Sequence, residues 1–377
     1  MDQWPCQSKK TVCWRLSRFL QMAVSLIGDY PQLEMLFGSS RIDRCGTNAS
    51  NRGFIAYPMS VAPPVPAGFV TQLSAFDPQA LVLALQEGFL EHVQLEQGRF
   101  GGQIVHSVSS QCRTDWGQYN LALLAKGDLS REWLSVGIFL QGHGSWRVQG
   151  KALRNGDLVV YAQGSEMCIS LPPQAQWMGV QIPRERLEVL GFQMPAGVTT
   201  LHLPGQLTPE ASGKLAELSS VLGPDRVQDP GSAVMEQAHE QLLQVIWSEL
   251  ARRWHKPTSS SVAQLRTRER LVNSVQQWCE DRTATPLRID ALCQDLGVPV
   301  WELERAFQHT YGMAPQRLMT LQRLAKTRRA LLTQTASVTD IAMGHGFWHL
   351  GRFSVLYKNY FGESPSETAR LVRHQSV

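Results

Sequence analysis

The chain has 377 residues, of which 43% are hydrophobic and 18% charged, and its formal net charge is only +4. These values are ordinary for a soluble globular protein, and the length is sufficient for two or three domains. No apolar run reaches the ~18 residues that a membrane-spanning helix needs, which argues against a membrane protein. The 7 cysteines form no Cys-x-x-Cys pair and are odd in number, so neither a disulfide framework nor a zinc ribbon is indicated. A reducing, cytoplasmic compartment is therefore expected.

The charge is distributed unevenly along the chain. Residues 1–58 carry a net charge of +3, residues 59–261 a net charge of −4, and residues 262–377 a net charge of +5. A cationic C-terminal third that follows an acidic middle predicts a polyanionic partner for that third alone.

Residues 1–58 form a polar, turn-rich stretch in which only Val12–Ile27 has a helical pattern. We expect a poorly ordered N-terminal extension, and one interpretation is that it precedes the natural start of the protein. Deletion of this stretch should then leave folding and activity intact.

A β-rich domain is predicted within residues 59–254. It opens with an expected helix over Pro78–Val93, because apolar residues recur there every four positions. Seven short runs of β type follow, divided by turn residues: Gln103–Ser109, Gln118–Leu124, Trp133–Leu140, Ser145–Val148, Leu158–Tyr161, Met167–Leu171 and Gln176–Ile182. Many short strands at this spacing predict a sandwich or a small barrel, which can enclose one small ligand.

The pattern then becomes helical over Pro183–Leu190, Glu210–Leu222 and Ala233–Arg253. The last of these has a wide apolar stripe that can pack on the barrel, on a partner subunit, or on both. We take it as the candidate dimer helix, with these contact residues: Ala238, Leu242, Ile246 and Leu250. A polar segment at residues 255–262, which contains Pro257 and three serines, predicts an interdomain linker.

The C-terminal third, residues 263–377, begins with a helical pattern over Gln264–Arg282 and then contains one arrangement twice. A short apolar helix over Leu287–Leu296 ends at a glycine and precedes an amphipathic helix over Val298–Tyr311. A second short helix, Val338–Met343, precedes Leu350–Phe361 in the same way.

A long helix that begins at Pro315 joins the two copies, and a last helix follows from Pro365. Two helix-turn-helix units in a basic region are far more specific for DNA binding than one unit. A helical bundle without a DNA role is the remaining alternative.

This third resembles the DNA-binding domain of the AraC/XylS family of bacterial transcription regulators, over roughly residues 266–373. The most specific matches are Leu292–Pro315 and the glycine-rich frame of Gly346–Glu367. The sequence departs from the family at Cys293, where alanine is usual, and at Ala369, where an aromatic residue is usual.

A finer resemblance concerns the segment between the second pair of helices. Phe347–Leu350 is similar to the corresponding segment of the ethanolamine-utilisation regulators within the family.

The resemblance implies an α+β protein with two domains. A cupin-like β-barrel sensor domain with flanking helices would precede an all-α domain with two helix-turn-helix motifs. The protein would bind double-stranded promoter DNA, with recognition helices at about residues 299–311 and 350–361 in successive major grooves. By the habit of the family it would be an activator that forms a homodimer, contacts RNA polymerase and responds to a small-molecule effector.

The residues expected to read bases lie on the exposed faces of those two helices: Trp301, Arg305, Gln308, His349, Gly351, Arg352 and Val355. Arg305 and Arg352 are the leading readers, because arginine can donate two hydrogen bonds to a guanine. Trp301 would pack on base methyls or sugar, or alternatively against a neighbouring helix. Gly351 would allow close approach of the backbone, and Val355 could contact a thymine methyl.

Phosphate contacts are expected from Arg317, Lys326 and Lys358, although Lys358 could also remain solvated. The long connecting helix carries further cations, of which we expect at least one to pair within the protein.

The inward strand positions of the barrel supply the candidate ligand pocket, which consists of Trp133, Phe139, Trp146, Trp177 and His106. These aromatic side chains either line a pocket or fill the barrel. No metal or cofactor is expected, since His106 and His143 stand alone rather than in a His-x-His motif. No nucleophile elbow, P-loop or dinucleotide fingerprint appears, so we do not expect an enzyme.

Two functions therefore remain open. The first is a regulator whose middle domain senses a small ligand. The second is a DNA-binding regulator whose middle domain only dimerises or binds a protein partner.

Overall fold

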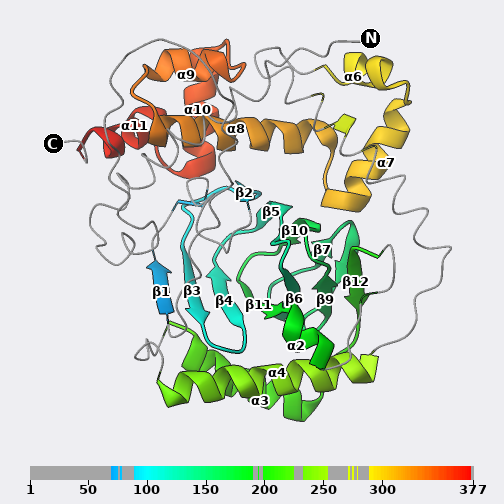
Figure 1. Cartoon of the computed structure of the whole chain (residues 1–377). Helices are drawn as coiled ribbons and strands as arrows, with labels where there is room; N and C mark the ends of the chain where they lie inside the picture. The colour runs from blue at the N-terminus through cyan, green and yellow to red at the C-terminus, as the bar shows by residue number, and fades with distance from the viewer. Residues whose placement is uncertain are drawn as a thin grey trace, which may run out of the picture. The chain divides into compact units, whose positions relative to one another are not determined.

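A computed structural model describes most of the chain beyond residue 68 (Figure 1). The described residues are 69–74, 77–78, 89–189, 194, 198–224, 232–253, 271, 274–275, 278 and 288–374. They all belong to one compact unit, Ala67–Val377. The expected extension at residues 1–58 and the expected linker at residues 255–262 lie outside the described residues, as does most of the expected helix at Gln264–Arg282.

Two antiparallel sheets make up the first half of the described chain. The seven-stranded sheet has the order β1-β3-β4-β11-β6-β9-β12, and the five-stranded sheet has the order β2-β5-β10-β7-β8. The strands of the larger sheet are β1 (Phe69–Ser74), β3 (Gly102–Val108), β4 (Arg113–Tyr119), β6 (Trp133–Gln141), β9 (Leu158–Tyr161), β11 (Ala175–Pro183) and β12 (Thr200–Leu203). Those of the smaller sheet are β2 (Phe89–Gln94), β5 (Leu123–Asp128), β7 (Trp146–Val148), β8 (Lys151–Leu153) and β10 (Glu166–Leu171).

Both sheets are buried on both faces. In β9, Val159 and Tyr161 face a core shared with the smaller sheet, whereas Leu158 and Val160 face a different core on the other side. This follows from the two-residue period of a strand, which sends successive side chains to opposite faces. In β10, Ile169 likewise joins the core between the sheets. The predicted set of short strands is confirmed for six of its seven members.

Three helices adjoin the larger sheet: α2 (Arg184–Val189), α3 (Pro209–Leu222) and α4 (Ala233–Arg253). Figure 1 shows α3 and α4 running side by side across one end of the strands. Thr208 caps α3 by accepting a hydrogen bond from the Ala211 backbone N–H.

The prediction for the dimer helix needs correction. Its four stripe residues are at most 4% exposed and pack on the larger sheet of the same chain: Ala238, Leu242, Ile246 and Leu250. Each buried Leu or Ile side chain contributes ~1.5–3 kcal/mol when it is removed from water. The stripe already obtains this stabilisation from the larger sheet of its own chain, so it is not free to contact a second copy.

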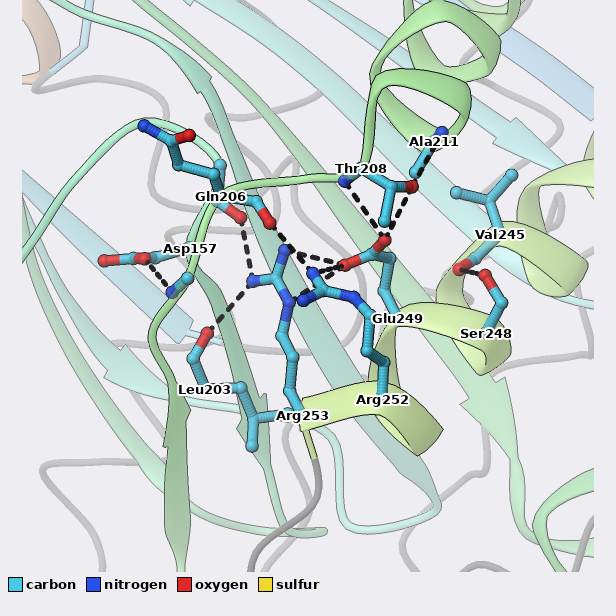
Figure 2. Close-up of polar contacts among 12 residues, drawn as sticks. Asp157, Leu203, Gln206, Thr208, Ala211, Val245, Ser248, Glu249, Arg252 and Arg253 are labelled. Carbon is cyan, nitrogen blue, oxygen red and sulfur yellow. Dashed lines mark hydrogen bonds and ion pairs between the residues drawn. The ribbon is translucent and has the colours of Figure 1, made fainter.

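A polar cluster fixes the C-terminal end of α4 to the strands (Figure 2). The Glu249 carboxylate is 2% exposed, lies 2.8 Å from the Arg253 Nη2 atom, and accepts hydrogen bonds from the Thr208 backbone N–H and side chain. Arg253 Nη1 donates to the carbonyl oxygens of Gly156 and Leu203 at 2.9 and 3.1 Å. The cluster therefore connects α4, the start of α3, the end of β12 and the turn between β8 and β9.

The second half is helical and contains α6 (Ile289–Leu296), α7 (Val300–Tyr311), α8 (Pro315–Thr333), α9 (Val338–Gly344), α10 (Leu350–Phe361) and α11 (Pro365–His374). The expected order and type of these helices are confirmed. Pro315 and Pro365 stand at the first helical position of α8 and α11, where a missing N–H costs nothing. Among the described residues, no helix is long and apolar enough to cross a membrane.

Two local predictions were wrong. Phe89–Gln94 is strand β2 rather than the end of a helix, and residues 79–88 lie outside the described residues. Apolar residues four positions apart share a face in a strand as well as in a helix, because four is a multiple of the strand period. Gln118–Leu124 is not one strand, because it contains the last two residues of β4, the connection at residues 120–122 and the first two residues of β5.

Candidate nucleic-acid interface

The two helix-turn-helix units have matching turns. In the first, Gly297 takes a left-handed conformation with φ 65°, and the Val298 N–H donates to the Cys293 carbonyl. In the second, Gly346 has φ 78°, and the Phe347 N–H donates to the Ala342 carbonyl. Only glycine adopts this conformation without steric cost, so each turn fixes the direction of the helix that follows.

The two second helices also end alike. Gly312 follows α7 with φ 72°, and Gly362 follows α10 with φ 76°. Each ends its helix by a C-cap and places a proline-initiated helix three residues later. The repeated arrangement expected from the sequence is therefore present in the backbone.

Helix α7 buries one face and exposes the other. Leu303, Ala306, Phe307 and Tyr311 are buried, whereas Thr310, which a helical wheel also places on this face, is half-buried. The opposite face carries Trp301, whose residue exposure is 62%, together with the exposed side chains of Arg305 and Gln308. Trp301 is therefore not packed against a neighbouring helix within the described chain.

Helix α10 is anchored by a row of aromatic rings. Phe353, Tyr357, Tyr360 and Phe361 are buried, and the ring centroids of Phe353 and Tyr357 lie 5.6 Å apart. A helical wheel also places Leu356 on this face, but Leu356 is 37% exposed, and Phe361, one turn after Tyr357, is buried instead.

The free face of α10 contains four of the residues expected to read or approach DNA. Gly351, Arg352 and Val355 are exposed, as is His349 at the N-cap, and Val355 reaches 62%. A Cβ atom added at Gly351 would meet nothing within 4 Å, so this part of the helix surface is open. Trp348, beside His349, is also 53% exposed and was not among the expected contacts.

The cations of the region fall into two groups. Arg305, Arg352, Arg317 and Lys358 are exposed and make no ion pair with any described residue. Lys326 is half-buried and likewise has no ion pair within the described part of the chain. These five were all expected to contact DNA.

The remaining arginines of α8 hold the protein together. Arg328 pairs with Asp77 and Glu363, and Arg329 pairs with Glu91. The expectation that some cations of the connecting helix pair internally is therefore confirmed.

Arg323 of α8 holds the turn of the second unit. Its Nε donates to the His345 carbonyl at 3.1 Å, its Nη2 donates to the Gly346 carbonyl, and its guanidinium lies 4.7 Å from the centre of the Phe347 ring. Burial lowers the pKa of this guanidinium from its ordinary value. Sequence reasoning placed Arg323 among the cations that supply positive charge, but its donors point at the protein backbone. Arg323 therefore orients α10 rather than binding DNA.

A separate cavity of about 110 Å³ lies between the two sheets. Of the five expected pocket residues, Phe139 and Trp177 line it. Trp133, Trp146 and His106 do not: Trp146 is fully buried, with its indole N–H donated to Asn155, and His106 lies 2.9 Å from Asp115. Sequence reasoning missed the polar residues of the lining.

One of those missed residues gives a pH prediction. Burial, helped by the positive charge of Arg329, lowers the pKa of His92 from 6.5 to about 4, against the opposing effect of Glu91. The unfolded chain therefore binds a proton that the folded chain does not bind between these pH values. Folding stability should fall as the pH drops from 6.5 toward 4, by roughly 3 kcal/mol from His92 alone.

Urea unfolding of wild type and His92→Gln across this pH range measures the effect. In the variant, the slope of the unfolding free energy against pH should decrease by the equivalent of about one bound proton. His349→Gln, which alters an exposed histidine, is the matched control, and an equal change in both variants would contradict the assignment.

The chain is similar to known DNA-binding proteins over the same helical region. Residues 292–371 match the model of a helix-turn-helix domain family. A probable thc operon regulatory protein of Rhodococcus erythropolis is 36% identical over 105 residues, which are 27% of this chain and 32% of that protein. The transcriptional activator RhaS of Escherichia coli is 34% identical over 96 residues, which are 26% of this chain and 34% of that protein.

Among solved structures, an AraC-type DNA-binding regulator from Chromobacterium violaceum is 26% identical, with a TM-score of 0.26 over 27% of this chain and 91% of that chain. The matches to the curated relatives span about a third of the length of each relative.

Matched glycine turns, buried aromatic anchors and two exposed helix faces, each with an arginine that makes no ion pair with a described residue, are the features of a helix-turn-helix DNA-binding region. Over this region the chain is similar to transcription regulators with AraC-type DNA-binding domains.

Proposed function

We propose that this protein is a sequence-specific transcription regulator that inserts α7 and α10 into successive major grooves of promoter DNA. The observation that supports the proposal best is the pair of exposed helix faces, each with an arginine that no described carboxylate neutralises. Apolar side chains, Trp301 and Val355, stand beside these arginines and suit contact with base methyls.

The connecting helix suits this arrangement. Helix α8 has 19 residues and so is ~28 Å long at ~1.5 Å per residue. Figure 1 shows it running from α7 at one end to α9, α10 and α11 at the other. Successive major grooves on one side of DNA lie ~34 Å apart, so a helix of this length can support one reader in each groove.

Selection of bound sequences from a random DNA library by the purified full chain tests the proposal. We expect enrichment of a motif with two base clusters about one helical turn apart. If no motif is enriched above the input library, the proposed function is wrong.

Replacing either leading arginine should alter sequence reading. We expect Arg352→Ala to weaken binding to the selected site by ~1–3 kcal/mol and to relax preference at one base position. Arg305→Ala should do the same in the other half of the site. Both follow from loss of a bidentate contact to guanine, and library selection with each variant measures them.

Lys358→Ala is the matched control, because a phosphate contact carries no sequence information. It should weaken binding to all sequences about equally and lower the salt dependence by about one counterion. The same uniform loss in Arg352→Ala would make Arg352 a phosphate contact.

The remaining parts of the proposal concern regulation. The two-sheet region serves as a cupin-like sensor for a small effector, two copies pair on DNA, and contact with RNA polymerase activates transcription. RhaS, which is similar to this chain over the DNA-binding region, is named as an activator, and this supports activation rather than repression. Expression from a promoter fusion in cells with and without the gene tests whether the protein activates transcription. Dimerisation must use a surface other than the apolar stripe of α4, because that stripe is buried within the chain.

A middle domain that only dimerises or binds a protein is the less favoured alternative. A closed core would serve that role, whereas a cavity with polar groups in its wall lies between the sheets here.

A further inference from the structure

The cavity between the sheets has buried polar atoms without partners. His92 Nδ1, Ser135 Oγ, Tyr161 OH and Gln181 Oε1 form no hydrogen bond within the described structure, and all four residues line the cavity. Each residue is at most 8% exposed. A buried polar atom without a partner costs ~1–3 kcal/mol, so four around one cavity indicate that a bound molecule supplies the missing partners.

Three of these residues form one row across the larger sheet. Ser135 of β6 is paired in register with Gln181 of β11 on one side and with Tyr161 of β9 on the other. Cross-strand partners point to the same face, at a separation of ~5 Å. The hydroxyl of Ser135 therefore lies between a second hydroxyl and an amide oxygen, and a ligand group that both donates and accepts can bind this row.

The next inward row of the same strands has no side chains. Gly137 is paired in register with Gly179. A Cβ atom at Gly137 would lie 3.7 Å from the Phe139 ring, and one at Gly179 would lie 3.6 Å from the Trp177 ring, which are ordinary contact distances. Alanine would fit at both positions, so packing of the surroundings does not require glycine. The two glycines instead leave the wall of the cavity open.

The row after the glycines is aromatic. Phe139 is paired in register with Trp177, and Trp177 lies 5.9 Å from the Tyr119 ring. Rows on one face of a strand are ~7 Å apart. Over ~14 Å, the side of the cavity formed by the larger sheet therefore changes from a row of hydrogen-bonding side chains, to the two glycines, to a row of aromatic rings.

The charge of the lining selects against ions. Asp115 is the one charged residue in it, and its Oδ1 atom already lies 2.9 Å from His106 Nδ1. The lining contains no lysine or arginine, so a carboxylate or phosphate would enter beside the Asp115 carboxylate, and Arg113, the register partner of Gln181, lies outside the lining. A cationic ligand would compete with His106 for Asp115. The opposite wall, from β2, β5 and β10, is apolar except for His92.

The size of the cavity limits the ligand further. A cavity of ~150 Å³ holds one benzene molecule, so about 110 Å³ suits a single ring or a short chain with one small polar group.

We propose that this cavity binds an uncharged, single-ring or short-chain molecule that carries one hydroxyl or amide group. Its polar group contacts Ser135, Gln181 and Tyr161, and its apolar body lies over Gly137 and Gly179 toward the aromatic row. This inference rests on the proposed function only in identifying the ligand as the effector.

Calorimetric titration of the DNA-free full chain with five isosteric probes tests it: benzyl alcohol, benzamide, toluene, benzoate and benzylamine. We expect benzyl alcohol or benzamide to bind at one site and more tightly than toluene and both ions. Ser135→Ala and Gln181→Met should each weaken the better neutral probe about tenfold, the effect of one lost hydrogen bond, while toluene binding should change little.

Gly137→Val is the filling variant, and it should abolish binding because its side chain occupies the floor of the cavity. Gly213→Ala, on α3 with nothing within 4 Å of the added Cβ atom, is the matched control and should bind as wild type does. A thermal melt of each variant confirms that it is folded.

Three results would overturn the proposal. These are no binding of either neutral polar probe up to its solubility limit, tighter binding of benzoate or benzylamine, and unchanged binding by Gly137→Val. Because the titration contains no DNA, failure of sequence-specific DNA binding would leave it unaffected. Failure of the titration would in turn leave the DNA-binding function in place.

Discussion

Arg328→Leu should destabilise the protein by ~3–5 kcal/mol, the cost of removing one partner from a buried ion pair. Arg328 lies in α8, and its side chain is 12% exposed. Its Nε atom is 2.5 Å from Asp77 Oδ2, and its Nη2 atom is 2.9 Å from Glu363 Oε1. Replacement by leucine leaves two largely buried carboxylates without their cation.

The same guanidinium has further partners that leucine cannot replace. Nη1 donates to the Tyr357 hydroxyl at 3.1 Å and to Thr368 Oγ1 at 3.3 Å, and the group lies 4.6 Å from the centre of the Phe361 ring. These residues belong to α10 and α11, so Arg328 attaches the second recognition helix to α8. Urea unfolding followed by circular dichroism measures the loss.

Arg329→Leu is a close control for that measurement. Its partner Glu91 is 39% exposed, and the pair is separated by 3.1 Å. The Arg329 side chain is 16% exposed, but water reaches the Glu91 end of the pair and screens it, so we expect a smaller loss than for Arg328, ~1 kcal/mol. Equal destabilisation by the two substitutions would show that burial of the Arg328 network does not determine its contribution.

Glu249→Leu should cost a similar ~3–5 kcal/mol at the other end of the molecule. The carboxylate accepts hydrogen bonds from Arg252, Arg253 and Thr208 (Figure 2), and its loss removes the carboxylate that is ion-paired with the 3% exposed Arg253 side chain. We expect the end of α4 to separate from the strands at lower urea concentration. Glu217→Leu, which breaks the exposed pair with Lys214, should change stability by less than ~1 kcal/mol.

The contribution of Glu249 should also depend on pH. Burial opposes its ionisation, but hydrogen bonds from Arg252, Thr208 and Arg253 outweigh burial and lower its pKa below the ordinary value. The stabilisation is therefore present above the unfolded-state pKa of ~4.3 and is lost as the pH falls through the lower folded-state pKa. Wild type should lose this stability in acid, whereas Glu249→Leu should not, and the unfolding free energies of the two should converge there. A gap that stays constant with pH would contradict the role of the ionised carboxylate.

The helical region was largely predictable because its signals are local. The bounds of Ala233–Arg253 and Leu350–Phe361 agree with the structure, since each combines a long 3.6-residue period with an end signal. Leu356 was misplaced because it lies at the edge of the apolar stripe, where a helical wheel does not decide between burial and exposure. Strand β2 was misread because its apolar spacing fits both periods.

The cavity was less predictable for a different reason. Ser135 and Gln181 each stand within an apolar strand, and a polar residue on an inward position is a signal that sequence reasoning could have used. Their convergence depends on the register between β6 and β11, which is a long-range property that no local pattern carries. Aromatic residues attracted the prediction instead, and of those only Phe139 and Trp177 lie in the lining.

The unbroken helix between the two readers has a consequence for the DNA itself. Residues of α7, α8 and α10 share one hydrophobic core, and Arg323 and Arg328 fasten the second unit to α8, so we expect α7 and α10 to keep a fixed relative orientation. A duplex turns once in ~10.5 base pairs, so an insertion of ~5 base pairs between the two base clusters would present one of them on the opposite side of the double helix. Operators of this protein should therefore tolerate base changes in the intervening sequence far better than changes in its length.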